Sequence, residues 1–198
     1  MYYEEKLRKL IQTKNGVILT KEVQNAKIPR QYLMILMQKN ELERVAQGVY
    51  VTPDTFKDEM YCIQVRSDKV IFSHETALYM HDLTDRDPLV YSVTVPRGYA
   101  TNRLRESGLD VATVKENLHY LGAEKMKTIH GRDVQVYNID RTICDIVRKC
   151  NQMDKDMFYV ALKRYAKSKE RDFKRLMEYA KKFRMEKAVM QYMEGIMV

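Results

Sequence analysis

The sequence predicts an α/β (α+β) protein with two domains. Residues 1–56 are expected to form a winged helix-turn-helix. Residues 57–198 are expected to form a mixed α/β domain that ends in a helical bundle. Three observations predict this: two short helices precede a hairpin in residues 20–52, strands and helices mix in the middle of the chain, and apolar residues recur at helical spacing from residue 140 onward.

The first domain is expected to begin with a helix over about residues 2–13 and a short strand at 17–19. A hairpin is expected later, with strands at 43–46 and 49–51 and a turn at Gln47-Gly48. The hairpin would be the wing of the domain. The absence of a Gly/Ser linker after Pro53 predicts that the second domain begins almost at once.

Two helices are expected between the first strand and the hairpin. Thr20 is a suitable N-cap for the first of them. Pro29 is expected at the first position of the second helix, because its fixed φ suits that position. Leu33, Leu36 and Met37 recur at the spacing of a buried stripe on the second helix, so the opposite side should face solvent.

The solvent side of that second helix carries amides and cations and no acids, and the wing adds an arginine and a glutamine. These groups suit hydrogen bonds to base edges, so we expect the helix to lie in the major groove of DNA. A small helical hairpin that contacts nothing would bury a similar stripe and is the structural alternative. The expected DNA-binding residues are Thr20, Lys27, Arg30, Gln31, Tyr32, Ile35, Gln38, Lys39, Arg44 and Gln47.

The second domain is expected to mix strands and helices. Ser73 and Asp140 are suitable N-caps, as is Asp154. The expected helices lie at 56–66, after Ser73, after Asp140, after Asp154 and over 185–196, and the expected strands lie at 90–95, 109–114, 125–130 and 134–137.

Positive charge is concentrated near the C-terminus. The chain has a formal charge of +8, and residues 141–198 hold 15 basic and 8 acidic side chains. Such a surface attracts polyanions without sequence specificity, so nucleic acid is the expected partner. An anionic membrane is a poor second, because no apolar run has spanning length and no helix shows a large, aromatic-rich lipid face. The amphipathic segment MYYEEKLRKL has no h-region or cleavage site, so it is not expected to be a signal peptide.

The C-terminal helices contain two candidate groups for repression or antitoxin function. Lys163, Arg164 and Lys167 belong to a basic run that either contacts phosphates or is only a solvated face. Arg141 and Asp145 are spaced i, i+4 on one helix, so they either pair with each other or serve function directly.

No catalytic, metal or cofactor site is expected. Ser73 and His74 are adjacent on an expected helix and would point about 100° apart, which separates a nucleophile from its base. The spacing of His74 and His81 does not suit a helical metal pair. Asp85-x-Asp87 lacks a preceding Gly-Ser phosphate turn. Three scattered cysteines predict reduced thiols in a cytoplasmic protein.

Several stretches resemble the AbiEi family, antitoxins of bacterial type IV toxin–antitoxin systems. In the first domain the resemblance rests on Ile-Pro-Arg-x-Tyr-Leu, Glu-Leu-Glu-Arg-Val and Gln-Gly-Val-Tyr-Val-Thr-Pro. In the second domain it rests on residues 73–85, 92–98 and 140–148, among them Ser-Val-Thr-Val-Pro-Arg-Gly and Asp-Arg-Thr-Ile-Cys-Asp-Ile-Val-Arg.

The resemblance implies a bacterial, cytoplasmic antitoxin of an abortive-infection (phage resistance) system that also represses its own operon. The first domain would bind double-stranded operator DNA, expected as an inverted repeat that takes two copies. The second would neutralise a nucleotidyltransferase-like toxin without a stable direct complex. Two alternatives remain open from the residues: a nucleic-acid-processing enzyme whose C-terminal domain is the catalyst, and a module that binds a protein through the wing.

Overall fold

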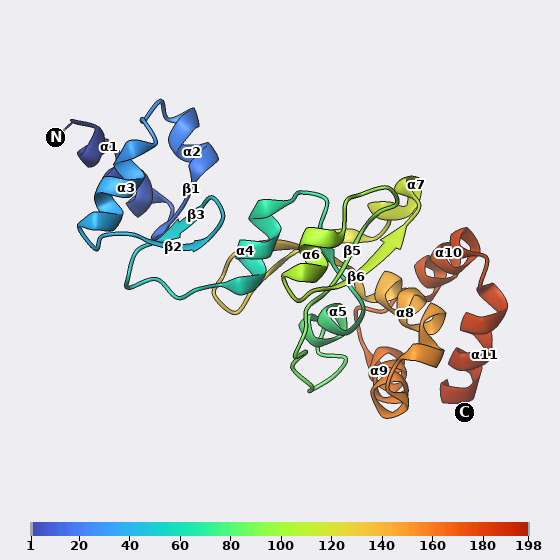
Figure 1. Ribbon diagram of the computed structural model, residues 1–198. Helices are drawn as coiled ribbons and strands as arrows, with labels where there is room; N and C mark the ends of the chain where they lie inside the picture. Colours follow the sequence, from blue (N-terminus) through green and yellow to red (C-terminus); the bar gives the residue numbers. More distant parts are fainter. Residues whose placement is uncertain (1, 198) are drawn as a thin grey trace. The chain divides into compact units, whose positions relative to one another are not determined.

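The computed structural model describes residues 2–197, and its contacts divide the chain into two compact units (Figure 1). The first unit contains residues 2–67 together with Thr128–Arg132. The second contains residues 68–127 and 133–197. In the described part of the chain, no helix combines the length and the apolar character needed to cross a membrane.

The first unit has the element order and strand order of a winged helix-turn-helix. Its sheet is antiparallel with the order β1-β3-β2. The first helix, the first strand and both hairpin strands have the predicted bounds. The elements are α1 (Tyr2–Thr13), β1 (Val17–Leu19), α2 (Thr20–Asn25), α3 (Gln31–Gln38), β2 (Glu43–Ala46), β3 (Val49–Val51) and α4 (Glu59–Arg66).

The starts of α2 and α3 differ from the sequence-based expectation. The N-cap position of α2 belongs to Leu19 rather than Thr20, and the Leu19 N–H donates to the Glu22 carboxylate at 3.0 Å. Pro29 lies before α3, whose N-cap position belongs to Arg30. Pro29 still helps to start the helix, because its carbonyl accepts a hydrogen bond from the Tyr32 N–H at 3.1 Å.

The sheet of the first unit is covered on both faces, and this explains where the unit ends. One face packs on the helical core, which includes Leu7, Ile18 and Leu36. On the other face Val17, Leu19, Val49 and Val51 pack with Cys62 of α4. Helix α4 therefore belongs to the first unit, and the division at Ser67 lies later than the boundary expected after residue 56.

The turn at Thr128–Arg132 belongs to the first unit because of polar contacts with α4 and the start of β1. Asp58 caps α4 by accepting from the Tyr61 N–H, and its other oxygen accepts from the Thr128 hydroxyl at 2.5 Å. Arg132 donates to the Asn15 carbonyl at 3.2 Å and lies over the Tyr61 ring. The contacts of Thr128 and Arg132 link residues 70 or more positions apart, which sequence spacing does not reveal.

The second unit is built on a five-stranded mixed sheet with the strand order β6-β5-β4-β8-β7. The pairs β4–β8 and β5–β6 are parallel, and β4–β5 and β7–β8 are antiparallel. The strands are β4 (Ile71–Phe72), β5 (Ser92–Pro96), β6 (Asp110–Val114), β7 (Ala123–Lys127) and β8 (Asp133–Tyr137). The four expected strands are present within a few residues of their predicted positions. The two-residue β4 was not predicted.

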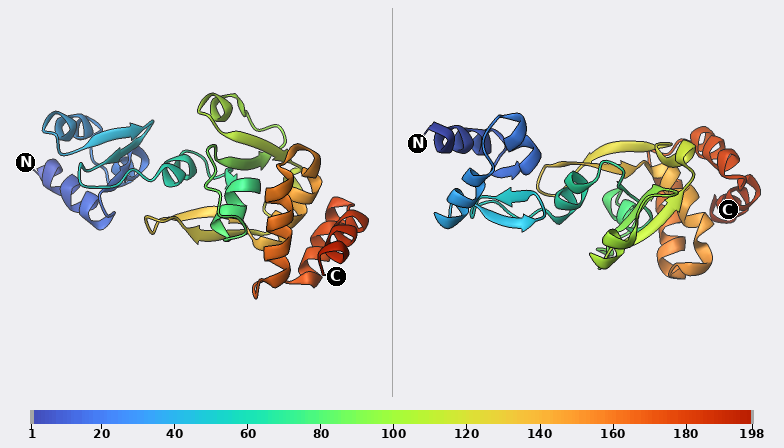
Figure 2. Two further views of the ribbon diagram at one scale, coloured as in Figure 1. Left: turned by 90° about the horizontal axis from the view of Figure 1, so that it is seen from below. Right: turned by 45° about the horizontal axis from the view of Figure 1, so that its top comes forward.

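Helices complete the second unit, and the last ones lie beside one another in orange and red (Figure 2). The predicted helical end is confirmed, whereas the short α6 and α7 were not foreseen. The helices are α5 (His74–Met80), α6 (Asn102–Glu106), α7 (Glu116–His119), α8 (Ile139–Arg148), α9 (Lys155–Lys167), α10 (Phe173–Phe183) and α11 (Glu186–Met197).

Helix α8 lies at the centre of this helical core and contains buried charges. Its N-cap is Asn138, whose side chain accepts from the Arg141 N–H at 2.9 Å. Asp140, which was expected to cap this helix, does not cap it. The buried Asp140 carboxylate instead accepts hydrogen bonds from the Tyr165 hydroxyl, the Asp172 N–H and the Arg175 guanidinium. These bonds tie α8 to the ends of α9 and α10.

Arg141 is fully buried, with a relative exposure of 0 %. Its Nε donates to Asp145 at 3.0 Å, and its Nη1 donates to the carbonyls of Leu118 and Leu121. Its guanidinium carbon lies 4.1 Å from the centre of the Tyr137 ring. A Cβ on Gly122 would lie 2.7 Å from the Arg141 Cβ, so only glycine leaves room for this side chain.

Replacing Arg141 by Leu should destabilise the protein by about 3–5 kcal/mol, because it leaves Asp145 buried without its main partner. Chemical denaturation measures the loss. The double variant Arg141→Leu/Asp145→Leu should recover part of it, because both charges are then removed. Arg86→Leu, which breaks the exposed pair with Asp154, should change stability far less. Equal losses for Arg141→Leu and Arg86→Leu would contradict the structural role of Arg141.

Candidate nucleic-acid interface

Helix α3 presents a polar face with unused hydrogen-bonding groups. Leu33 and Leu36 are buried in the core of the unit, which turns the other side of the helix outward. Arg30, Gln31 and Gln38 are exposed, and none has a side-chain partner among residues 2–197. The first turn of α3 contains no acidic residue. This face therefore offers amide and guanidinium donors to a ligand in solution.

Helix α1 holds α2 and α3 in place through its own cations. The Lys6 ammonium donates to the Ala26 carbonyl at the end of α2, at 2.8 Å. Arg8 makes a bidentate ion pair with Glu41, which follows α3, at 2.7 and 2.8 Å. The hydrogen bond from Arg8 lowers the pKa of Glu41. The orientation of α3 is therefore fixed by its apolar stripe and by charged contacts behind it.

Lys39 belongs to the same group of charges. Its ammonium lies 2.6 Å from the Glu4 carboxylate, and this hydrogen bond lowers the pKa of Glu4. Lys39 was expected to bind DNA. In the structure it joins the end of α3 to α1, whereas Arg30 has no such partner among the described residues.

The wing is tied to the start of α2. The Thr20 N–H donates to the carbonyl of Gly48, the turn residue, at 2.9 Å. Gly48 has φ +76°, a conformation that side chains other than glycine rarely adopt. The register of β2 and β3 shifts between Arg44 and Ala46, which marks a bulge in the wing. Arg44 and Gln47 are exposed, and the Arg44 Nε makes one long bond of 3.4 Å to the Ala46 carbonyl.

The remaining expected residues differ in exposure. Lys27 is exposed in the turn before α3 and has φ +55°. Thr20, Tyr32 and Ile35 are half-buried. Tyr32 packs against Tyr3, with ring centres 5.3 Å apart, so it contributes chiefly to the core. The structure thus brings Arg30, Gln31 and Gln38 together on α3, and it places Arg44 and Gln47 on the wing.

Two further side chains join the candidate surface. Met34 lies on the outward side of α3 and is 65 % exposed, which suits contact with a thymine methyl group. Lys21 is exposed in the first turn of α2, without a partner in the described chain. The sequence could have indicated Lys21 as a candidate, because it follows Thr20 at the start of an expected helix. Met34 had the helical spacing of the outward face, and this was the sequence signal for it.

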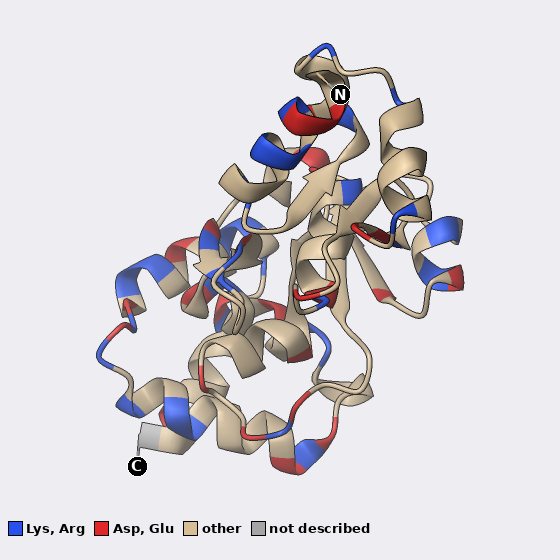
Figure 3. Ribbon diagram, turned by 90° about the vertical axis from the view of Figure 1, so that its left-hand side faces the viewer, with Lys and Arg blue, Asp and Glu red and all other residues tan. Residues whose placement is uncertain are grey.

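The C-terminal basic run is only partly free. Arg164 binds the Asp85 carboxylate in a bidentate pair and also donates to the Asp82 carbonyl at 3.1 Å. Lys163 and Lys167 are exposed without partners in the described residues, and with Arg171 and Ile196 they line an open hollow of about 530 Å³. Blue Lys and Arg segments lie on the helices near the C-terminus in Figure 3.

Arg141 and Asp145 do not belong to an accessible surface. The ion pair that the sequence left open is present, with relative side-chain exposures of 0 % and 1 %. Both groups are therefore structural in this geometry, and any influence on repression or antitoxin function would act through the fold of α8.

The chemistry around Ser73 also differs from expectation. His74 has φ +49°, so it departs from helical geometry, and its Nδ1 lies 2.9 Å from the Ser73 hydroxyl. The Ser73 side chain makes no capping bond to α5. Within residues 2–197, no group of three or more His, Cys, Asp or Glu side chains could hold a metal ion.

Comparisons with known proteins support the sequence resemblance. Residues 5–53 match the family described as "Transcriptional regulator, AbiEi antitoxin", and this confirms the AbiEi resemblance for that segment. The match supports a role as a transcriptional regulator or antitoxin. It spans most of α1, then α2, α3 and the wing, and it reaches neither α4 nor the second unit. A search of curated proteins found no match to the chain.

A solved structure has a similar fold. The crystal structure of the RV2827C protein from Mycobacterium tuberculosis matches with a TM-score of 0.67 and 10 % sequence identity. The match covers 98 % of this chain and 77 % of that one. At this identity the likeness concerns the fold alone. Together with the family match it agrees with the predicted α/β class, an N-terminal helix-turn-helix followed by a helical C-terminal region.

Proposed function

We propose that the chain, whose residues 5–53 match the AbiEi antitoxin regulators, represses its own operon by binding operator DNA through α3 and the wing. The observation that carries the proposal is the set of unpaired donors on the outward side of α3, Arg30, Gln31 and Gln38.

In the proposed complex α3 lies in the major groove. Glutamine can pair with adenine and arginine with guanine through two hydrogen bonds each, and these contacts distinguish one base pair from another. The wing contacts the backbone or the minor groove through Arg44 and Gln47, whose exposed positions on the hairpin support this role. Two copies of the chain would occupy an inverted repeat.

We propose further that the chain is a non-enzymatic antitoxin of a type IV system and acts in the bacterial cytoplasm. Its functional partner would be a nucleotidyltransferase-like toxin, neutralised without a stable direct complex. The resemblance of residues 73–85, 92–98 and 140–148 supports this part of the proposal. The alternative that the residues leave open is a nucleic-acid-processing enzyme with the C-terminal domain as catalyst, and among residues 2–197 no group of three or more His, Cys, Asp or Glu side chains could hold a metal ion for it.

Gln31→Ala should weaken binding to the operator by about 1–3 kcal/mol and binding to random DNA much less, because a base contact is lost. Fluorescence anisotropy with both duplexes measures the difference. Gln12→Ala is the matched control, since Gln12 is an exposed glutamine near the end of α1 and is not on α3. Equal losses on operator and random DNA would rule out base recognition by Gln31.

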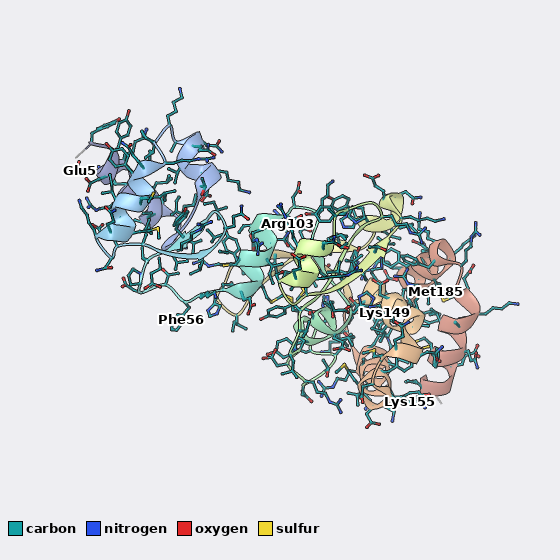
Figure 4. All side chains as sticks on the ribbon, in the orientation of Figure 1. Glu5, Phe56, Arg103, Lys149, Lys155 and Met185 are labelled. Atoms are coloured by element: carbon teal, nitrogen blue, oxygen red, sulfur yellow. The ribbon has the colours of Figure 1, made fainter. Side chains whose placement is uncertain are left out.

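Arg44→Ala should weaken binding to both duplexes and reduce the slope of log K against log salt by about one, because one phosphate contact is lost. Titrations at several salt concentrations give the slope. Arg103→Ala removes the same charge from an exposed position on α6, labelled in Figure 4, and should leave the slope unchanged. An unchanged slope for a folded Arg44→Ala variant would exclude the phosphate contact.

The C-terminal basic hollow should add affinity that does not depend on sequence. Exchanging Lys163, Lys167 and Arg171 for Gln should weaken operator binding and lower the salt slope by up to about three. Arg164 is kept, because its removal would leave Asp85 unpaired.

The matched control exchanges Lys115, Lys125 and Lys155, which are exposed elsewhere in the second unit, for Gln. Both sets are made in the full chain, because residues 1–56 alone would lack α4 and Thr128–Arg132. If the two triple variants bind alike across the salt series, Lys163, Lys167 and Arg171 form a solvated face without a specific role.

A further inference from the structure

The basic hollow near the C-terminus has the size of a small-molecule site. It is formed by α9, by α11 and by the loop after α9, and the two helices lie side by side in Figures 1 and 2. Its volume of about 530 Å³ falls within the range of about 300–1,000 Å³ that is typical of such sites. Its lining residues are Lys163, Ala166, Lys167, Arg171 and Ile196.

Every charged side chain that lines this hollow is a cation. Lys163, Lys167 and Arg171 are exposed, and none has a hydrogen-bond or ion-pair partner among residues 2–197. Arg164 on the same helix differs, because the Asp85 carboxylate neutralises it in a bidentate pair. Three unpaired cations around one hollow repel one another, so an anion that enters the hollow would relieve this repulsion.

The walls of the hollow are fixed by the packing behind them. Phe158 of α9 and Tyr192 of α11 pack edge to face, with their ring centres 5.0 Å apart. Arg171 lies in a short loop whose next residue, Asp172, donates its N–H to the buried Asp140 carboxylate at 3.0 Å. A ligand would therefore meet a backbone that is already in place, and only the long cationic side chains would lose freedom on binding.

The apolar part of the lining restricts the class of ligand. Ala166 and Ile196 are half-buried and line the same hollow as the cations. An inorganic phosphate or triphosphate would pair with the cations but leave these apolar side chains in water. A ligand with a ring beside its phosphates would cover Ile196, while its phosphate oxygens accept charge-assisted hydrogen bonds from the cations. A nucleotide has this composition.

We propose that the hollow binds a free nucleoside triphosphate. Its phosphates would accept from Lys163, Lys167 and Arg171, and the ring of its base or sugar would pack on Ile196. DNA phosphates share the first part of this chemistry. Under the proposed function the hollow also contacts DNA, so a bound nucleotide would lower the affinity for the operator. This competition rests on the proposed function, whereas the binding of the nucleotide itself does not.

Isothermal titration calorimetry on the full chain tests the site in the absence of DNA. The ionic strength is held constant, and Mg²⁺ is omitted because it binds phosphates itself. The probes are the four ribonucleoside triphosphates, inorganic triphosphate and adenosine. At least one nucleoside triphosphate should bind saturably, and more tightly than inorganic triphosphate or adenosine. The proposal is overturned if none of the four binds or if inorganic triphosphate binds as tightly as each of them.

Exchanging Lys163, Lys167 and Arg171 together for Gln should weaken this binding about tenfold or more, because three charge-assisted contacts are lost. The control triple variant described under the proposed function has the same net charge and should bind the nucleotide as the unaltered protein does. Equal losses in the two folded variants would attribute the binding to net charge alone and overturn the proposal.

Ile196→Thr tests the apolar contact, because it keeps the branched side chain and adds a hydroxyl. This variant should bind the nucleoside triphosphate more weakly and inorganic triphosphate as before. Unchanged nucleotide affinity in the folded variant would overturn the assignment of a nucleotide.

The competition is measured by anisotropy with the operator duplex. A saturating nucleotide should weaken operator binding by the full chain and leave it unchanged in the variant without Lys163, Lys167 and Arg171. If the nucleotide binds and operator affinity does not change, the competition is overturned. A failure of the proposed contacts of α3 would instead appear in operator titrations without nucleotide, so the two results are distinguishable.

Discussion

The first unit depends on the pairing of β3 with two strands at once. β1 precedes both helices of the helix-turn-helix, and β2 follows them, so the pairing of β3 with both closes the segment that contains α2 and α3. The register places Tyr50 opposite Ile18 on one side and opposite Arg44 on the other. One strand of three residues therefore closes the segment that contains α3 and pairs with both of its flanking strands.

Much of this arrangement could be predicted because its signals are local. The apolar stripe of α3, the alternation in the hairpin and the glycine of its turn each operate within about ten residues. The exposed positions of Arg30, Gln31 and Gln38 follow from the same stripe. Lys39 could not be assigned in this way, because its partner Glu4 is 35 residues distant. The cap of α2 was also missed, because Leu19 holds the N-cap position and its N–H donates to the Glu22 carboxylate, while the Thr20 N–H donates to the Gly48 carbonyl of the wing.

The second unit was less predictable because its polar residues are buried. Asp140, Arg141 and Asp145 have the sequence signs of a helix cap and a surface ion pair, yet all three are within 1 % of full burial. Their partners come from α7, α9, α10 and the loops beside them, and only the tertiary fold supplies these. His74 was also misjudged from helical spacing, which predicted that its ring would point away from Ser73. Its left-handed backbone instead brings the ring nitrogen Nδ1 to 2.9 Å from the Ser73 hydroxyl.

The bond between Thr20 and Gly48 has a consequence for how an operator would be read. Because the tip of the wing is joined to the first turn of α2, the distance between the wing and the helix pair cannot vary freely. Under the proposed function, a DNA duplex could fit α3 and yet hold the phosphates near the wing at a different distance from that helix. Binding would then have to break the Thr20–Gly48 hydrogen bond or deform the DNA. Under the proposed function, the first unit would therefore select DNA by groove width and flexibility, including at base pairs that no side chain touches.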